Sequence, residues 1–344
     1  MNYYEISKRI SNDFSCKQCL HPDASQLTCS KQIVRAHTVR KSADLKKLSE
    51  AGHVYHMSFD AKIMDKPPEE FKPTKIGINR ASTFYGFCST HDTEIFAPIE
   101  TQAFKGTPEQ CFLLGYRAFS KEVHSKEGAI RSVDTIREYA GKSQSMGRHE
   151  VEQAISAFEL GTKSSQYDLK VHYEIYQHAL IEKEWDEFRA VIIYFDSLPD
   201  ILCSGISKPE YDFLGNQLQD LGQINIVHKM ITLNILTLND VSVAVFQWQK
   251  NSDSINLPFI NSLLSLPTED IPHAVARAAF ESTENLYFRP SWWEKLAEND
   301  KRNLLVRAVS GTPLKPRGSS DLKDDSTRFV NWKVGEIIRV NMSA

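Results

Sequence analysis

Apolar residues recur at helical spacing through the middle of the chain. Over residues 107–187 they fall three, four or seven positions apart, which is the period of an amphipathic helix. The first helix is expected to open at Thr107, a favoured N-cap, with Pro108 at the first helical position and Gln110 completing a capping box. A second helix is expected over residues 149–187, so this segment is predicted to be mostly helical.

After residue 190 the pattern changes to that of strands. Residues 191–195 form a short apolar run, and residues 224–236 and 241–248 are two runs rich in strand-forming side chains. Turn-forming residues at 238–240 separate the last two runs, so a β-hairpin is predicted. Toward the C-terminus we expect a helix over 290–309, an exposed loop over 311–325 and a final strand over 329–340.

The first hundred residues differ from both patterns, because they are rich in Cys and His and poor in long helical periodicity. These contrasts predict an α+β protein in three segments: a Cys/His-rich domain over residues 1–104, a helical region over 105–189 and a C-terminal α+β region over 190–344. The pattern changes near residues 97–106, which contain Pro98 and Gly106. We therefore expect separate hydrophobic cores on the two sides of that stretch.

The composition limits the class of protein and its compartment. The chain has 344 residues and a formal net charge of -3, which excludes a general polyanion binder and leaves room for a local basic patch. No apolar run is long enough to span a bilayer, and residues 1–12 lack the apolar segment of a signal peptide. We therefore expect a cytoplasmic protein, in which closely spaced cysteines bind metal rather than form disulfides.

Two pairs of Cys and His residues have the spacing of metal knuckles. Cys16 and Cys19 form a C-x2-C pair, and Cys88 and His91 form a C-x2-H pair. Thiolate and imidazole ligands in tetrahedral arrangement suit Zn²⁺, and a closed site of four protein ligands is structural rather than catalytic. The pattern predicts one structural zinc ion held by these four side chains.

Other Cys and His residues leave part of this assignment open. Cys29 and His21 compete as ligands, and Cys29 could replace one of the four although it has no partner at knuckle spacing. Cys111 and Cys203 lie alone in apolar surroundings and are expected to be packing residues.

A basic stretch follows the first knuckle. Residues 31–47 hold six basic side chains and one acidic side chain, a local charge of +5 on an otherwise acidic chain. Arg35, Arg40 and Lys41 lie in this stretch and are the expected contacts to nucleic-acid phosphates. A solvated helix over residues 42–51 would explain some of these charges equally well.

The residues between and after the knuckles resemble those of a known family. A strand is predicted at Ile33-Val34-Arg35-Ala36-His37-Thr38-Val39, with His37 near its end, and a helix opens at His91-Asp92-Thr93-Glu94. This order, from C-x2-C through Ala-His and a central polar residue to C-x2-H at a helix start, resembles the treble-clef HNH endonucleases over residues 16–96. The resemblance implies a zinc-bound ββα-metal domain that hydrolyses phosphodiesters with a further divalent ion, Mg²⁺ or Mn²⁺.

The resemblance also implies roles for three residues. His37 would deprotonate the attacking water, Asn79 would orient His37, and Asp92 would hold the catalytic ion, with Glu94 as an alternative ligand. Ala36 stands where many HNH sites have a carboxylate ligand, so one ligand is missing. Apart from the resemblance, His37 also fits a strand-end histidine or a zinc ligand, Asn79 a turn residue, and Asp92 a carboxylate at a helix N-terminus.

Three classes of function follow from these residues. The first is a metal-dependent HNH nuclease, and fold analogy relates such domains fused to helical regions to bacterial restriction and phage-defence effectors. The second is a zinc-stabilised module that binds nucleic acid or protein without cleavage, and the third is a scaffold. The expected partners are nucleic acid, DNA rather than RNA, and a protein bound through the C-terminal region, with no membrane.

Overall fold

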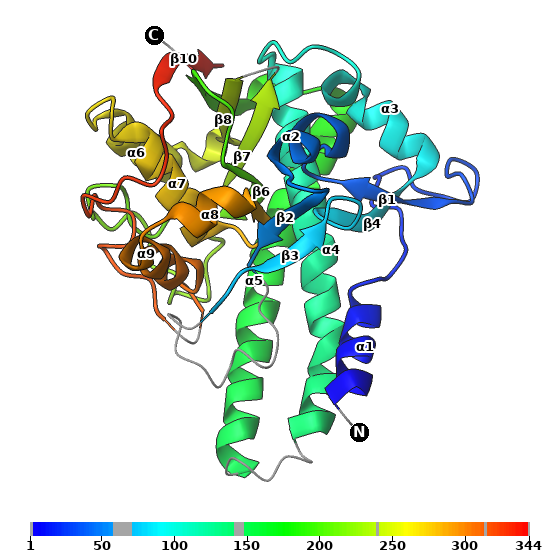
Figure 1. Ribbon diagram of the computed structural model, residues 1–344. Coiled ribbons are helices and arrows are strands. Elements are labelled where there is room, and N and C mark those ends of the chain that lie inside the picture. The colour runs from blue at the N-terminus through cyan, green and yellow to red at the C-terminus, as the bar shows by residue number, and fades with distance from the viewer. Residues whose placement is uncertain (1–2, 58–70, 141–147, 239–240, 313–314, 343–344) are drawn as a thin grey trace.

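The computed structural model describes residues 3–57, 71–140, 148–238, 241–312 and 315–342 and is an α+β structure with a large antiparallel sheet (Figure 1). The helices are α1 (Tyr3–Asp13), α2 (Lys46–Leu48), α3 (Ser89–Glu100), α4 (Pro108–Ala140), α5 (Arg148–Glu182), α6 (Asp253–Leu264), α7 (Ile271–Ser282), α8 (Pro290–Lys295) and α9 (Glu298–Ala308). The strands are β1 (Ile33–His37), β2 (His53–His56), β3 (Thr74–Gly77), β4 (Thr83–Cys88), β5 (Phe188–Phe195), β6 (Ile201–Ser207), β7 (Ile231–Leu238), β8 (Val241–Gln249), β9 (Leu286–Phe288) and β10 (Val334–Val340). No helix of the described ranges has the length and apolar character needed to cross a bilayer.

Eight strands form the main sheet in the order β10-β5-β8-β7-β6-β9-β2-β3, and β1 and β4 form a separate antiparallel pair. The hairpin predicted around residues 238–240 is confirmed as β7 and β8, which pair up to Leu238 and Val241. Its turn residues 239–240 lie outside the described residues. Strands β2 and β3 extend the sheet through the pairing of Tyr55 with Phe288, although they come from the first hundred residues.

Both faces of the main sheet are covered. Alternate residues of a strand point to opposite faces, and in β5 Val191 and Ile193 lie in one hydrophobic cluster whereas Ala190 and Ile192 lie in the other. Helices α6 and α7 contribute to the first cluster, and α4 and α5 contribute to the second. This double burial explains the unbroken apolar run of β5 from Ala190 to Ile193.

Each of the two hydrophobic clusters contains residues from both sides of the predicted boundary at residues 97–106. Val39, Leu45 and Val54 belong to the same buried cluster as β5 to β8, and Phe84 and Phe87 belong to the same cluster as α4 and α5. The expectation of separate cores on the two sides of residues 97–106 is therefore wrong. The segments 1–104, 105–189 and 190–344 differ in sequence pattern, but their apolar side chains are buried together in these two clusters.

An ion pair fastens the segment after β1 to the main sheet. Arg40 donates to Asp44 at 2.9 Å through both Nε and Nη2. The same two side chains bind the backbone of Thr237 on β7: Asp44 Oδ1 accepts its N–H at 2.8 Å, and Arg40 Nη2 donates to its carbonyl at 2.8 Å. The pair thus satisfies both the N–H and the carbonyl of Thr237, as a neighbouring strand would.

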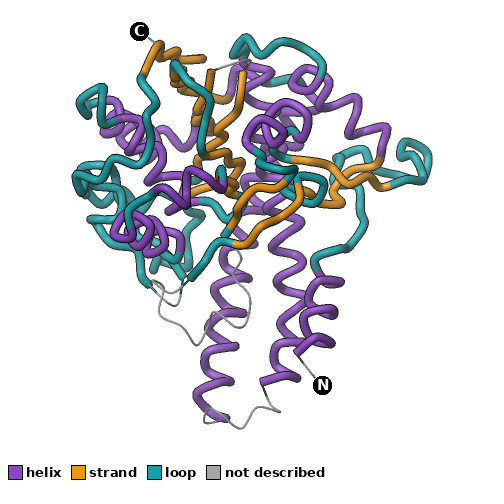
Figure 2. The backbone as a smooth tube through the Cα atoms, viewed as in Figure 1, coloured by secondary structure: helices purple, strands orange, loops and turns teal. Residues whose placement is uncertain are grey.

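The long helices form as predicted, with corrected ends. The Thr107 hydroxyl caps α4 by accepting the N–H of Gln110 at 3.2 Å. The Gln110 side chain does not bond back to Thr107; it holds the preceding loop by donating to Pro98 and Ala103 and accepting from Lys105. Helices α4 and α5 extend as a hairpin well beyond the strands (Figure 2).

Two helix boundaries differ from the prediction. Helix α5 ends at Glu182 rather than near residue 187, because β5 begins at Phe188 and Lys183 adopts a left-handed conformation with a φ of 58°. The helix expected over 290–309 is two helices, α8 and α9, because Leu296 and Ala297 between them have extended backbones.

Candidate metal centre

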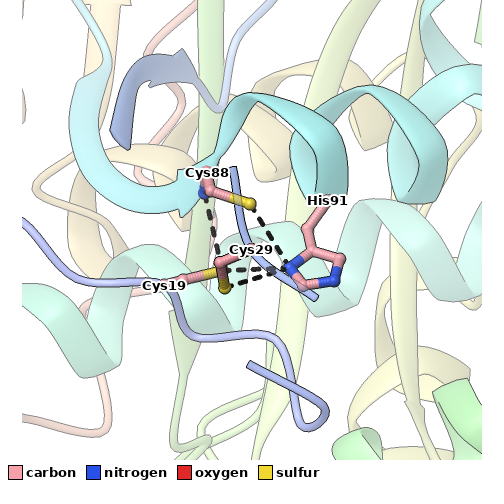
Figure 3. Close-up of side chains that lie close together, drawn as sticks. All are labelled: Cys19, Cys29, Cys88 and His91. Atoms are coloured by element: carbon pink, nitrogen blue, oxygen red, sulfur yellow. Dashed lines mark hydrogen bonds between the residues drawn. The ribbon is translucent and has the colours of Figure 1, made fainter. Parts of the chain in front are cut away.

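Four side chains from distant parts of the chain meet at one point. The sulfur atoms of Cys19, Cys29 and Cys88 and a ring nitrogen of His91 all lie within 4.8 Å of one another. The three sulfurs lie 3.3 Å (Cys19), 3.7 Å (Cys29) and 3.4 Å (Cys88) from Nδ1 of His91 (Figure 3). These residues could hold a metal ion, and three thiolates with one imidazole are a donor set that zinc takes up in structural sites.

The second knuckle arises at the junction of a strand and a helix. Cys88 is the last residue of β4, and His91 lies in the first turn of α3. The chain turns sharply there, from an extended Cys88 with a ψ of 161° into the helix, and both side chains reach the same point. This pair is found where the sequence predicted it.

The first knuckle is not the pair that the spacing predicted. The structure brings Cys29 to the cluster and leaves Cys16 out. The segment containing Cys19 lies beside β4, since the N–H groups of Gln18 and Leu20 donate to the carbonyls of Tyr85 and Gly86.

With residues 18–20 fixed beside β4, the Cys19 side chain reaches the cluster and the Cys16 side chain does not. The Cys16 carbonyl instead accepts a hydrogen bond from Nε2 of His124 on α4, at 2.8 Å.

The two long helices, α4 and α5, hold the loop that carries Cys19 in place. The carbonyl of Leu20, next to Cys19, accepts hydrogen bonds from the Tyr173 hydroxyl at 3.1 Å and from Nε2 of Gln177 at 3.2 Å. The ring of His21, a competing ligand in the sequence prediction, stacks on the His91 ring with centroids 3.9 Å apart and planes 8° apart. His21 therefore orients a ligand and is not one of the four converging side chains.

The thiols of the centre differ in acidity. Burial raises the pKa of the Cys19 thiol to about 11. At Cys88 burial also acts to raise the pKa, but hydrogen bonds with the His91 backbone and with Ser30 outweigh it and lower the pKa to about 6. A metal ion would bind thiolates and would therefore displace the remaining protons.

His37 and Asp92 lie on neighbouring elements and share a charged environment. Burial lowers the pKa of His37 at the end of β1, and burial raises the pKa of Asp92 on α3. Both side chains interact electrostatically with Glu100 and Arg117. Arg117 on α4 donates to Glu100 at 2.5 Å and lies over the Phe96 ring at 4.1 Å.

The Nε2 atom of His37 is buried and has no hydrogen-bond partner among the described residues. Asn79 lies exposed in the turn after β3, next to Ile78, whose backbone forms a hydrogen bond with His37. Among the described residues, only the Cys/His cluster brings three or more His, Cys, Asp or Glu ligand atoms within 4.8 Å of one another.

The three basic residues singled out from the sequence have different environments. Lys41 is exposed, and Arg35 is exposed beside Tyr85. Arg40 has only 13% of its side chain exposed and is engaged by Asp44 and Thr237. Its guanidinium stabilises the fold and is not presented to a phosphate, which corrects the interpretation of Arg40 as a nucleic-acid contact.

Comparison of the chain with protein-family models, with curated proteins and with solved structures finds no match. The likeness to HNH endonucleases therefore stays an inference from residue pattern.

Proposed function

We propose that this chain is a metal-dependent nuclease of the HNH type whose catalytic element is stabilised by a structural zinc ion. Two ligands precede the β1–β4 pair, and two lie where β4 passes into α3. A strand pair followed by a helix, tied together by one ion at the start of that helix, is the arrangement that the HNH resemblance implies. Zinc would take the role of the small core that this segment lacks.

The observation that carries the proposal is the state of His37. Its buried Nε2 has no hydrogen-bond partner in the described part of the chain, and burial lowers the pKa of the ring, so His37 is neutral near pH 7 and can accept a proton. In this proposal His37 deprotonates the water that attacks the phosphodiester. Asp92 offers carboxylate oxygens to Mg²⁺ or Mn²⁺, and Arg117 counters negative charge at the same place.

The test compares two histidine variants of the full chain. His37→Ala is expected to reduce cleavage of duplex DNA, single-stranded DNA or RNA by about 10²- to 10⁴-fold, the usual contribution of a general base. His53→Ala is the matched control, since His53 is an exposed histidine on β2. Both proteins should keep their zinc, measured by elemental analysis. A His37→Ala protein as active as the parent would exclude His37 as the base.

A second function is favoured by Ala36. This residue is only 5% exposed, pairs with Phe84 across the strands and offers no carboxylate where many HNH sites have one. A protein that binds nucleic acid but cleaves none with Mg²⁺ or Mn²⁺ would be a zinc-stabilised binding module instead.

A further inference from the structure

Two cations and an aromatic ring form a cluster on the β1–β4 pair, here called the Tyr85 clamp and consisting of Lys17, Arg35 and Tyr85. The Lys17 ammonium lies 5.3 Å from the centroid of the Tyr85 ring, and the Arg35 guanidinium lies 5.5 Å from it. Arg35 also donates to the Tyr85 hydroxyl from Nε at 3.2 Å and from Nη2 at 3.0 Å. The ring thus holds two positive charges close together at the surface.

The strand pairing produces the clamp. A bulge between Val34 and Ala36 interrupts the ladder at Arg35. Its neighbour Ala36 is buried in the core whereas Arg35 is exposed, so the Arg35 side chain projects to the solvent face. Lys17 reaches Tyr85 because its segment runs beside β4, with Gln18 N–H bonded to the Tyr85 carbonyl.

Among the described residues, several arginines are neutralised by a carboxylate, whereas the two cations of the clamp are not. Arg117, Arg189 and Arg317 each pair with a carboxylate, at 2.5 Å, 2.8 Å and 2.6 Å. No carboxylate in the described part of the chain forms a salt bridge with Lys17 or Arg35. Glu127, which accepts from Gln18 beside Lys17, is itself paired with Arg131 at 3.7 Å. Two ordered cations without a carboxylate partner favour an anionic ligand.

We propose that the Tyr85 clamp binds the phosphate backbone of a nucleic-acid strand and leads it along β1 toward His37. The inference rests on the proposed nuclease function and names the surface that holds its substrate. His37 follows Arg35 by two residues on β1, a separation of about 7 Å at strand spacing. The clamp replaces Arg40 as the phosphate contact and adds Lys17 and Tyr85, which the basic stretch after the first knuckle did not include.

The test measures binding rather than cleavage. The full zinc-loaded chain is titrated into a fluorescein-labelled single-stranded DNA without added divalent ions, over a series of salt concentrations. The double variant Lys17→Ala/Arg35→Ala is compared with Lys333→Ala/Arg339→Ala, which removes one lysine and one arginine exposed at β10. Losing two phosphate contacts should weaken binding and reduce the slope of log K against log salt by about 1.4. Tyr85→Phe keeps the ring and removes the oxygen that orients Arg35, so its binding should be intermediate.

The outcomes separate this inference from the proposed function. Equal binding by the two double variants, or a parent protein that does not bind the DNA, overturns the clamp. Cleavage that persists with unchanged affinity in Lys17→Ala/Arg35→Ala refutes the clamp and leaves the nuclease proposal standing. Binding that depends on the clamp in a chain that never cleaves refutes the nuclease proposal alone. Thermal melting and zinc content of each variant show whether the fold is intact.

Discussion

The sulfur of Cys29 lies 3.7 Å from Nδ1 of His91, across 62 residues of sequence. This contact predicts that Cys29→Ser will lose the metal ion or bind it much more weakly, with a lower melting temperature, because metal-binding energy here contributes to folding. Cys16→Ser is the matched control and should keep one ion per chain, since Cys16 lies outside the cluster. Elemental analysis and thermal melting check both variants, and loss of metal from Cys16→Ser alone would restore the C-x2-C assignment.

Asp44 is fully buried and binds Arg40 and Thr237. We expect Asp44→Ala to destabilise the chain by about 3–5 kcal/mol, because it leaves a largely buried guanidinium and a backbone N–H without their partner. Lys41→Ala, an exposed change three residues away, should stay within about 0.5 kcal/mol of the parent. Urea unfolding measures both. A small effect of Asp44→Ala would mean that β7 does not depend on this pair.

Gly115 on α4 lies against the sheet so closely that a Cβ atom there would clash with Oε1 of Gln247. That oxygen accepts a hydrogen bond from Tyr176 at 2.6 Å, so Gly115→Ala should displace a buried side chain and cost about 1–3 kcal/mol.

Gly161 on α5 is the control, because an added Cβ would meet no atom within 4 Å. Gly161→Ala should stabilise the chain by about 0.5–1 kcal/mol through helix propensity. Thermal melting of both variants tests the packing of α4 on the sheet, and a stabilising Gly115→Ala would show that the helix lies farther away.

His273 on α7 accepts the backbone N–H of Phe329 at Nδ1, at 3.1 Å. Burial, with the charges of Arg328 and Arg277, lowers its pKa to about 4, while Asp270 and Asp324 act in the opposite sense. The folded state therefore holds a neutral ring that takes up a proton in the unfolded state below about pH 6.5.

The stabilisation from His273 is present above about pH 6.5 and is lost as pH falls toward 4. His273→Asn keeps a hydrogen-bond acceptor without this titration, so its melting temperature should fall less than that of the parent over this range. Parallel pH profiles for the two proteins would contradict the assignment.

Local sequence was sufficient to predict elements whose formation depends on neighbouring residues of the chain. Thr107 caps α4 because its hydroxyl needs only the N–H three residues on. Turn chemistry and apolar runs predicted β7 and β8, and the two-residue spacing of Cys88 and His91 predicted a pair at the start of α3. Helix α7 was not predicted, because residues 271–280 are all buried and leave no exposed polar face over that length. Helix α6 was not predicted either, and Pro258 lies inside it.

Tertiary structure decided the features that depend on distant residues. Spacing could not choose between Cys16 and Cys29, because the choice follows from the alignment of residues 18–20 with β4. A count of charges could not separate Arg40, which is paired in the core, from Arg35, which lies exposed on Tyr85. Sequence determines which residues are charged, apolar or metal-binding; only packing decides which of them meet and which charges are neutralised, because those contacts join segments far apart in the chain.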